Sequence, residues 1–141
     1  TVFWELRNAD AKILRQESIP VTVAPLSSLW LDTVELPDAD IYENYVSYRI
    51  EQNGTTISNG TVLFCAPKFF RFRNPKLSVR ADGDLLTVSG SCYAKSVRIW
   101  NDADDLKLDD NYFDLNGGTR TVRVLEGNPE GLRVMSVYDI R

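Results

Sequence analysis

The densest group of side chains that could do chemistry is a run of aspartates in the second half of the chain, Asp102, Asp104, Asp105, Asp109 and Asp110. Clustered carboxylates serve two kinds of site, the acid–base pair of a glycosidase and a calcium-binding loop. A glycosidase needs two carboxyls that face each other across a sugar, and closeness within one loop does not provide that. In a calcium loop starting at Asp102, Lys107 would stand where glycine is required and Phe113 where glutamate is required. We therefore interpret the run as a solvated loop between strands.

Other catalytic and metal chemistry is restricted by composition, because the chain contains no histidine. This excludes Ser-His-Asp and Cys-His nucleophilic sites and histidine-ligated metal centres. We predict no catalytic residue, no cofactor-binding residue and no metal ligand. The two cysteines, Cys65 and Cys92, are predicted to be buried free thiols, since an unpaired cysteine behaves as a small hydrophobe. A bridge between them is the alternative.

Aromatic side chains offer a binding function instead of catalysis, because a ring face can stack on the C–H face of a sugar. Trp4 is in phase with Leu6 in an alternating run and is predicted to lie in the core. Trp100 is out of phase with Val97 and Ile99, so it is the candidate carbohydrate contact on an exposed face. Two interpretations of Trp100 stay open, and a place in the core or in a domain interface is favoured over a sugar platform.

A basic and aromatic stretch, KFFRFR at residues 68–73, resembles the stacking platforms that bind single-stranded nucleic acid. Such proteins carry a wide basic field, which is missing here. Residues 1–66 hold 4 basic and 9 acidic side chains, and residues 67–141 hold 12 and 11. We therefore interpret the stretch as a connecting segment whose phenylalanines pack between domains while its arginines reach water or acidic neighbours. No nucleic-acid partner is expected.

The elements that position these residues are predicted from alternation with period two, which is typical of half-buried strands. We expect strands at 2–7, 12–24 with a break around Pro20, 28–36, 45–52, 56–65, 77–81, 85–90, 95–100, 110–115, 119–125 and 132–138. Turn residues punctuate them at Asn53-Gly54, Asp82-Gly83-Asp84 and Asn116-Gly117-Gly118. No amphipathic helix pattern appears, and no apolar run approaches the ~18 residues of a membrane span. The pattern predicts an all-β chain without a membrane segment.

Two prolines, Pro67 and Pro75, bracket the basic and aromatic stretch, and proline fits poorly inside a central strand. We therefore predict two domains, residues 1–67 and 76–141. Immunoglobulin-like sandwiches hold about seven strands, and the first half offers fewer. The prediction is two immunoglobulin-like antiparallel β-sandwich domains, the first truncated at its N-terminus. An unpaired strand edge there would invite self-association.

Several stretches resemble the C-terminal immunoglobulin-like domains of β-mannosidases. Residues 110–115 read DNYFDL and are followed by a glycine turn at 116–119 and a valine-rich strand at 120–125. Residues 134–141 resemble the last strand of that family. Residues 1–7, TVFWELR, resemble a hairpin strand of the preceding linker domain.

The resemblance implies a parent enzyme of glycoside hydrolase family 2 type that releases terminal β-linked mannose with retention. Its two catalytic glutamates would lie in a (β/α)₈ barrel, and no position here corresponds to them. The expected partner is that barrel, in a parent that is extracytoplasmic (periplasmic or secreted) or lysosomal. The favoured function is a non-catalytic accessory region. A carbohydrate-binding module that contacts mannan or glycan through exposed aromatics is the alternative, and the DNYFDL block argues against an unrelated cell-surface stalk.

Overall fold

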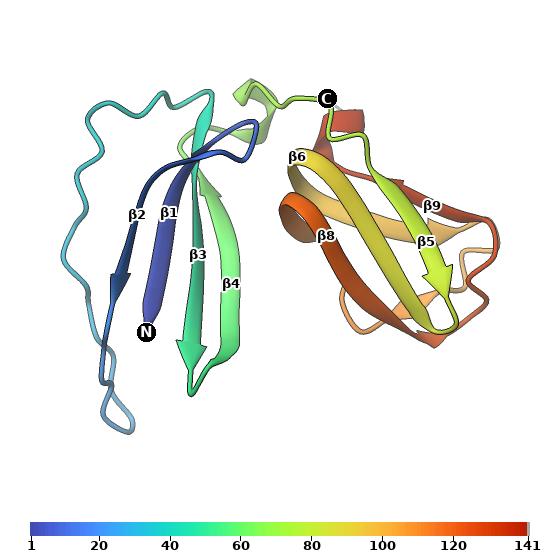
Figure 1. The fold of residues 1–141 in the computed structure, drawn as a ribbon, viewed down its shortest axis with the longest axis horizontal. Helices are drawn as coiled ribbons and strands as arrows, with labels where there is room; N and C mark the ends of the chain where they lie inside the picture. The colour runs from blue at the N-terminus through green and yellow to red at the C-terminus, as the bar shows by residue number, and fades with distance from the viewer. Residues whose placement is uncertain (141) are drawn as a thin grey trace.

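The computed structural model describes residues 1–140, in which strands and two short 3₁₀ helices are the only regular elements (Figure 1). The 3₁₀ helices are η1 (Pro67–Phe69) and η2 (Val137–Ile140). The strands are β1 (Val2–Asn8), β2 (Ile13–Ile19), β3 (Asn44–Gln52), β4 (Thr55–Leu63), β5 (Ser78–Asp82), β6 (Leu85–Asn101), β7 (Lys107–Leu108), β8 (Phe113–Glu126) and β9 (Leu132–Met135). The predicted all-β class is confirmed. Neither helix of this region has the length and apolarity to cross a membrane.

The first domain is a single antiparallel sheet in the order β2-β1-β3-β4. Its registers give it two different faces, because successive side chains of a strand point to opposite sides. One face is apolar and carries Val2, Trp4, Leu6, Val46, Tyr48 and Ile50. The other face is polar and carries Glu5, Arg7, Ser47, Arg49, Asn59 and Thr61. Trp4 is buried, which confirms its predicted place in the core.

The segment between β2 and β3 corrects the sequence prediction. The strand expected at 28–36 is absent. The break expected around Pro20 is confirmed, since β2 ends at Ile19, but no strand resumes in residues 20–24. In Figure 1 this segment runs along the outer side of β2 without joining a sheet. A strand needs a neighbour that accepts its backbone hydrogen bonds, and the turn bonds of this segment are local, such as the one from Ser27 N to Ala24 O.

The second domain is built on two long strands, β6 and β8, in the order β5-β6-β8-β7, with β9 paired to the C-terminal half of β6. The pairing of β6 with β8 shifts twice, which bends both strands around one core. The core consists of Leu86, Val88, Ala94, Val97, Ile99, Phe113, Leu115 and Val122. The expected architecture of two immunoglobulin-like β domains is confirmed by the antiparallel sheets together with the family models described below.

These long strands correct three further predictions. The strands expected at 85–90 and 95–100 form one strand, β6. The strand expected at 110–115 begins only at Phe113 and continues through 119–125 as β8. The glycines of Asn116-Gly117-Gly118 adopt φ of 71° and 72°, but β8 stays paired with β6 on both sides of them, so they bend a strand rather than close a hairpin. The last expected strand, 132–138, ends at Met135.

Candidate functional site: a polar cleft between the domains

An aromatic core joins the two domains. Tyr45 of β3 and Tyr93 of β6 stack with ring centroids 3.8 Å apart and an interplanar angle of 14°. Phe70 and Phe72 of the linker pack against them, and Ala9 completes the cluster. Aromatic contacts of this kind contribute about 0.5–1.5 kcal/mol beyond the area that they bury. The core therefore fixes one domain against the other.

The linker arginines lie on the opposite side of this segment. Arg71 and Arg73 both reach the carboxylate of Glu43, at 3.5 and 3.6 Å. Phe70 and Phe72, which alternate with them, are buried. The interpretation of residues 68–73 as a packing segment between domains is confirmed for these four side chains. Phe69 is the exception, since it stays exposed.

A hydrogen-bonded layer continues from the aromatic core toward solvent. The Tyr45 hydroxyl donates to Asn116 Oδ1 at 2.9 Å, and Asn116 Nδ2 donates to Ser47 Oγ at 2.8 Å. The Tyr93 and Thr61 hydroxyls lie 2.7 Å apart. Burial raises the pKa of both tyrosine hydroxyls well above the usual value, so both stay protonated and can donate.

Asp114 ends the second branch of this layer. It accepts hydrogen bonds from the Thr61 hydroxyl, from the Ser96 N–H at 2.8 Å and from Lys95 Nζ at 3.3 Å. Because the Thr61 hydrogen is used on this carboxylate, Tyr93 is the donor in its bond with Thr61. Asn116 and Asp114 come from β8, while Thr61 belongs to β4. The layer therefore links the domains with directed bonds as well as apolar contact.

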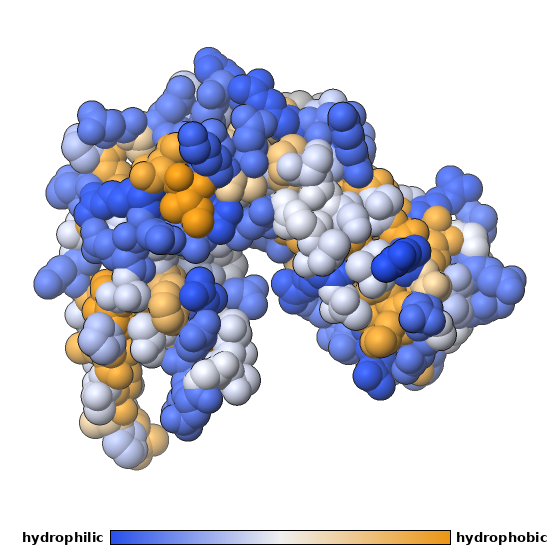
Figure 2. Space-filling model, viewed as in Figure 1, coloured by the Kyte–Doolittle hydropathy of each residue, from blue (hydrophilic) through white to orange (hydrophobic). Residues whose placement is uncertain are grey.

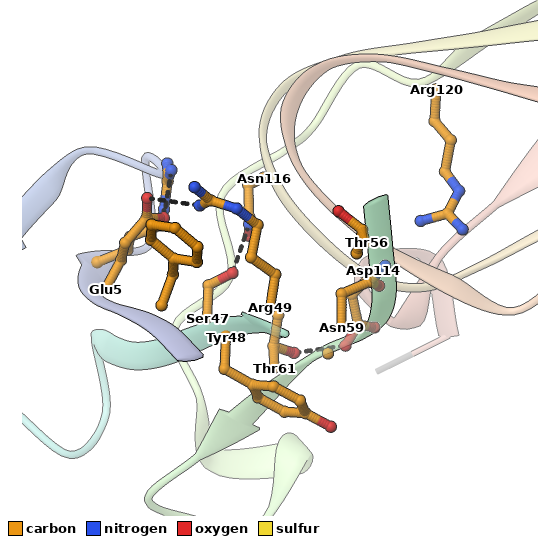
Figure 3. Close-up of a pocket in the computed structure, with 13 residues that line it drawn as sticks. Glu5, Ser47, Tyr48, Arg49, Thr56, Asn59, Thr61, Asp114, Asn116 and Arg120 are labelled. Atoms are coloured by element: carbon orange, nitrogen blue, oxygen red, sulfur yellow. Dashed lines mark hydrogen bonds and ion pairs between the residues drawn. The ribbon is translucent and has the colours of Figure 1, made fainter. Parts of the chain in front are cut away.

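Above this layer lies a cleft of about 280 Å³ between the polar face of the first sheet and the start of β8 (Figure 3). On the first wall, Arg49 donates to Glu51 at 2.8 Å and its guanidinium lies 4.0 Å from the centroid of the Phe3 ring. On the second wall, Arg120 bonds Asp110 and lies over the Phe113 ring at 4.6 Å. Both arginines are thus held in place by a carboxylate and by a ring face.

The cleft offers two carboxylates and a set of hydrogen-bonding side chains. Its two lining carboxylates are both occupied, Glu5 by Arg7 at 2.6 Å and Asp114 by Lys95 at 3.3 Å. A glycosidase needs one carboxyl as acid and a second as nucleophile or base, facing the same bond. Glu5 of β1 and Asp114 of β8 are each held by a cation, so neither carboxylate is free of a protein partner. Its remaining chemistry is hydrogen bonding.

Trp100, the candidate carbohydrate contact, lies away from this cleft. It sits on β6 opposite Arg133 of β9 and is partly exposed. The guanidinium of Arg98 covers one ring face at 4.9 Å from the centroid. Within residues 1–140 no second aromatic ring stacks with it. A sugar contact at Trp100 stays a prediction.

The aspartate run is a solvated loop, as interpreted from the sequence. Its members have separate partners, Asp102 with Arg133 at 2.6 Å and Asp105 with Asn101 at 2.5 Å. Four of the five aspartates are exposed. The described part of the chain contains no cluster of three side chains able to hold a metal ion.

The cysteines are free, as predicted. Cys92 is buried, whereas Cys65 is only partly buried, which corrects the expectation that both would be buried. Burial raises the pKa of the Cys92 thiol. A buried, protonated thiol is a poor nucleophile, so Cys92 is a packing residue.

The cleft residues were missed by the sequence analysis. Arg49 lay within the strand expected at 45–52, Asp114 within the DNYFDL stretch and Asn116 within an expected turn, and none of them was predicted as a site residue. One weak sequence signal for the cleft existed. Glu5 and Arg7 occupy consecutive positions on the same face of a predicted strand, and so mark that face as charged. What brings β8 against that face is the domain packing, which no local pattern reveals.

Comparison with known families assigns both halves of the chain. Residues 1–68 match the family model described as the mannosidase Ig/CBM-like domain. Residues 72–140 match the Ig-fold domain model of mannosidases. The two matches together span nearly the whole chain. A search of curated proteins finds no match.

Proposed function

Because the chain belongs to the immunoglobulin-like domain families of mannosidases, we propose that it is the non-catalytic C-terminal accessory region of a β-mannosidase-type glycoside hydrolase. The parent would release terminal β-linked mannose with retention, using two carboxylates of a separate barrel domain. The DNYFDL stretch at 110–115 supports this choice of enzyme. The occupied carboxylates of the cleft support a non-catalytic role.

The single observation that carries the accessory role is an exposed apolar surface on the first domain. The segment between β2 and β3 leaves large side chains in solvent, with Trp30 94% exposed. Further exposed members are Val23, Leu26, Leu29, Leu31 and Val34. In Figure 2 apolar atoms run down the limb at the lower left that this segment forms. A contiguous apolar surface of this kind marks an interaction site.

We propose that the barrel domain of the parent covers this surface. The second domain contacts the polar side of the first sheet, through Asn116 and Asp114, so the exposed segment between β2 and β3 is left for another partner. An accessory region needs a permanent contact with its enzyme, and permanent contacts are the more apolar ones. The docked region would stabilise the enzyme without touching its substrate.

The test compares the parent enzyme with a version that lacks this region. We expect the shortened enzyme to lose thermal stability, while the Michaelis constant of the remaining active fraction for an aryl β-mannoside is unchanged. The isolated chain should hydrolyse no β-mannoside. Hydrolysis by the isolated chain, or a shortened enzyme as stable as the full one, would overturn the proposal.

A further inference from the structure

The two walls of the interdomain cleft present hydrogen-bonding groups that the protein itself leaves unused. Asn59 lies opposite Arg49 in the pairing of β4 with β3, and its amide has no protein partner within residues 1–140. The hydroxyl of Thr56, further along β4, has none in that region either. Arg49 Nη2 and Arg120 Nη1 are likewise left over after the arginines have bonded Glu51 and Asp110.

These groups line the same cleft. Thr56, Asn59 and Arg49 come from the polar face of the first sheet, and Arg120 comes from β8 of the second domain. Figure 3 shows the Arg120 guanidinium on the side of the cleft where Thr56 and Asn59 lie. A ligand in the cleft would therefore be held from both domains at once.

The charges around the cleft are balanced. The lining itself holds three cations, Arg7, Arg49 and Arg120, and two carboxylates, Glu5 and Asp114. The partners Lys95, Glu51 and Asp110, which lie outside the lining, complete four ion pairs with them. Each arginine already has a carboxylate partner, so an added anion would meet repulsion as well as attraction. A neutral ligand meets no such opposition, and it can use the spare donors of the arginines and both the donor and the acceptor of Asn59.

The two arginines among the spare groups are also restrained before a ligand arrives. Arg49 is fixed by Glu51 and by the ring of Phe3, and Arg120 by Asp110 and the ring of Phe113. Immobile side chains lose little rotamer entropy on binding, which favours affinity for a small ligand. The volume of about 280 Å³ is at the small end of ligand sites.

From this geometry we propose that the interdomain cleft binds a short neutral saccharide, with Arg49 and Asn59 on one wall and Arg120 on the other as its hydrogen-bonding residues. Vicinal hydroxyls of a sugar match the paired N–H groups of a guanidinium, and each hydroxyl both donates and accepts. The site is distinct from Trp100 and from the apolar surface of the first domain. It does not depend on the accessory role proposed above.

The test is a calorimetric and NMR titration of the full chain with β-1,4-mannobiose, with cellobiose and, as an anion probe, with sodium sulfate. We expect saturable binding of at least one disaccharide in the millimolar range, with amide shifts concentrated around Asn59, Arg49 and Arg120. Arg49→Gln and Asn59→Ala should each weaken binding about tenfold. The matched controls are Arg98→Gln and Trp100→Ala, which should leave affinity unchanged, and circular dichroism checks that each variant is folded.

Three results would overturn the proposal. Binding of sulfate without binding of either disaccharide would make the cleft an anion site. Loss of sugar binding in Trp100→Ala, with shifts around β9, would place the sugar at the other candidate. No detectable binding of either disaccharide throughout the millimolar range would show that the cleft does not bind a saccharide. None of these results bears on whether the chain stabilises its parent enzyme.

Discussion

The two domains enclose their apolar side chains in different ways. The second domain wraps β6 and β8 around a core of its own, in which Leu86, Val88 and Val97 are fully buried. The first domain has one sheet, and two of its most buried side chains, Ala9 and Tyr45, are buried against the second domain and the linker. The second domain can thus account for its own stability, whereas the first depends on contacts outside its sheet.

The largest expected effect on stability comes from truncating a leucine in the core of the second domain, compared with an exposed leucine of the first domain. Leu86→Ala removes a fully buried side chain and should lower the free energy of unfolding by about 3 kcal/mol. Leu29→Ala in the exposed segment of the first domain should change it by less than about 0.5 kcal/mol. Urea unfolding followed by circular dichroism measures both. Equal losses of unfolding free energy in Leu86→Ala and Leu29→Ala would contradict the difference between the domains.

The dependence of the first domain on the linker is tested by Phe70→Ala. This change opens the aromatic core beneath Tyr45 and Tyr93 and should cost about 3 kcal/mol, because a buried ring is lost. We expect the first domain to unfold at lower urea than the second, which would split one transition into two. The signals of Trp4 and Trp100 report on the separate domains. A single shifted transition would show that the two domains do not unfold independently.

The next largest effect is expected at alkaline pH, which should destabilise the aromatic core between the two domains. The pKa values of Tyr45 and Tyr93 are raised by burial, while in the unfolded chain each titrates near 10.0. Above that pH the unfolded state loses protons that the folded state keeps, so stability is complete below pH 10.0 and falls as pH rises further. The expected slope is about 1.4 kcal/mol per pH unit for each tyrosine. Tyr45→Phe should reduce the slope, and an unchanged slope would contradict this assignment.

The smallest expected effect on stability belongs to Trp30→Ser. Trp30 is 94% exposed, so its replacement should leave the free energy of unfolding within about 0.5 kcal/mol of the original. The same change should reduce self-association of the isolated chain at high concentration, because an exposed apolar surface favours contact between copies. Light scattering measures the average mass. If the chain is monomeric at every concentration, with or without Trp30, the exposed apolar surface does not promote self-association.

Alternation predicted most of the strands because it depends on neighbouring residues alone. Trp4 and Leu6 were placed in the core from their phase, and the structure confirms both. The glycine bend in β8 was predicted as a turn because Asn-Gly and Gly-Gly favour positive φ whether the chain reverses or only bulges. Which of the two occurs depends on β6, which pairs on both sides of the bend.

The segment at 28–36 was predicted as a strand for a similar reason. Its many apolar residues suit a strand. A strand also requires a partner beside it, however, and sequence pattern carries no information on that. The interdomain cleft could not be predicted for the same reason. Arg49 and Arg120 lie far apart in the chain, and only domain packing brings them to one cleft. The domain limits at residues 67 and 76 stay a prediction.

The central claim is that the exposed surface of the first domain is covered in the parent enzyme. Amide hydrogen exchange of residues 20–36 tests it most directly, measured in the isolated chain and in the proposed parent enzyme. The account predicts fast exchange in the isolated chain and strong protection in the parent, with the amides of β6 equally protected in both. Equally fast exchange of residues 20–36 in both proteins would contradict the claim.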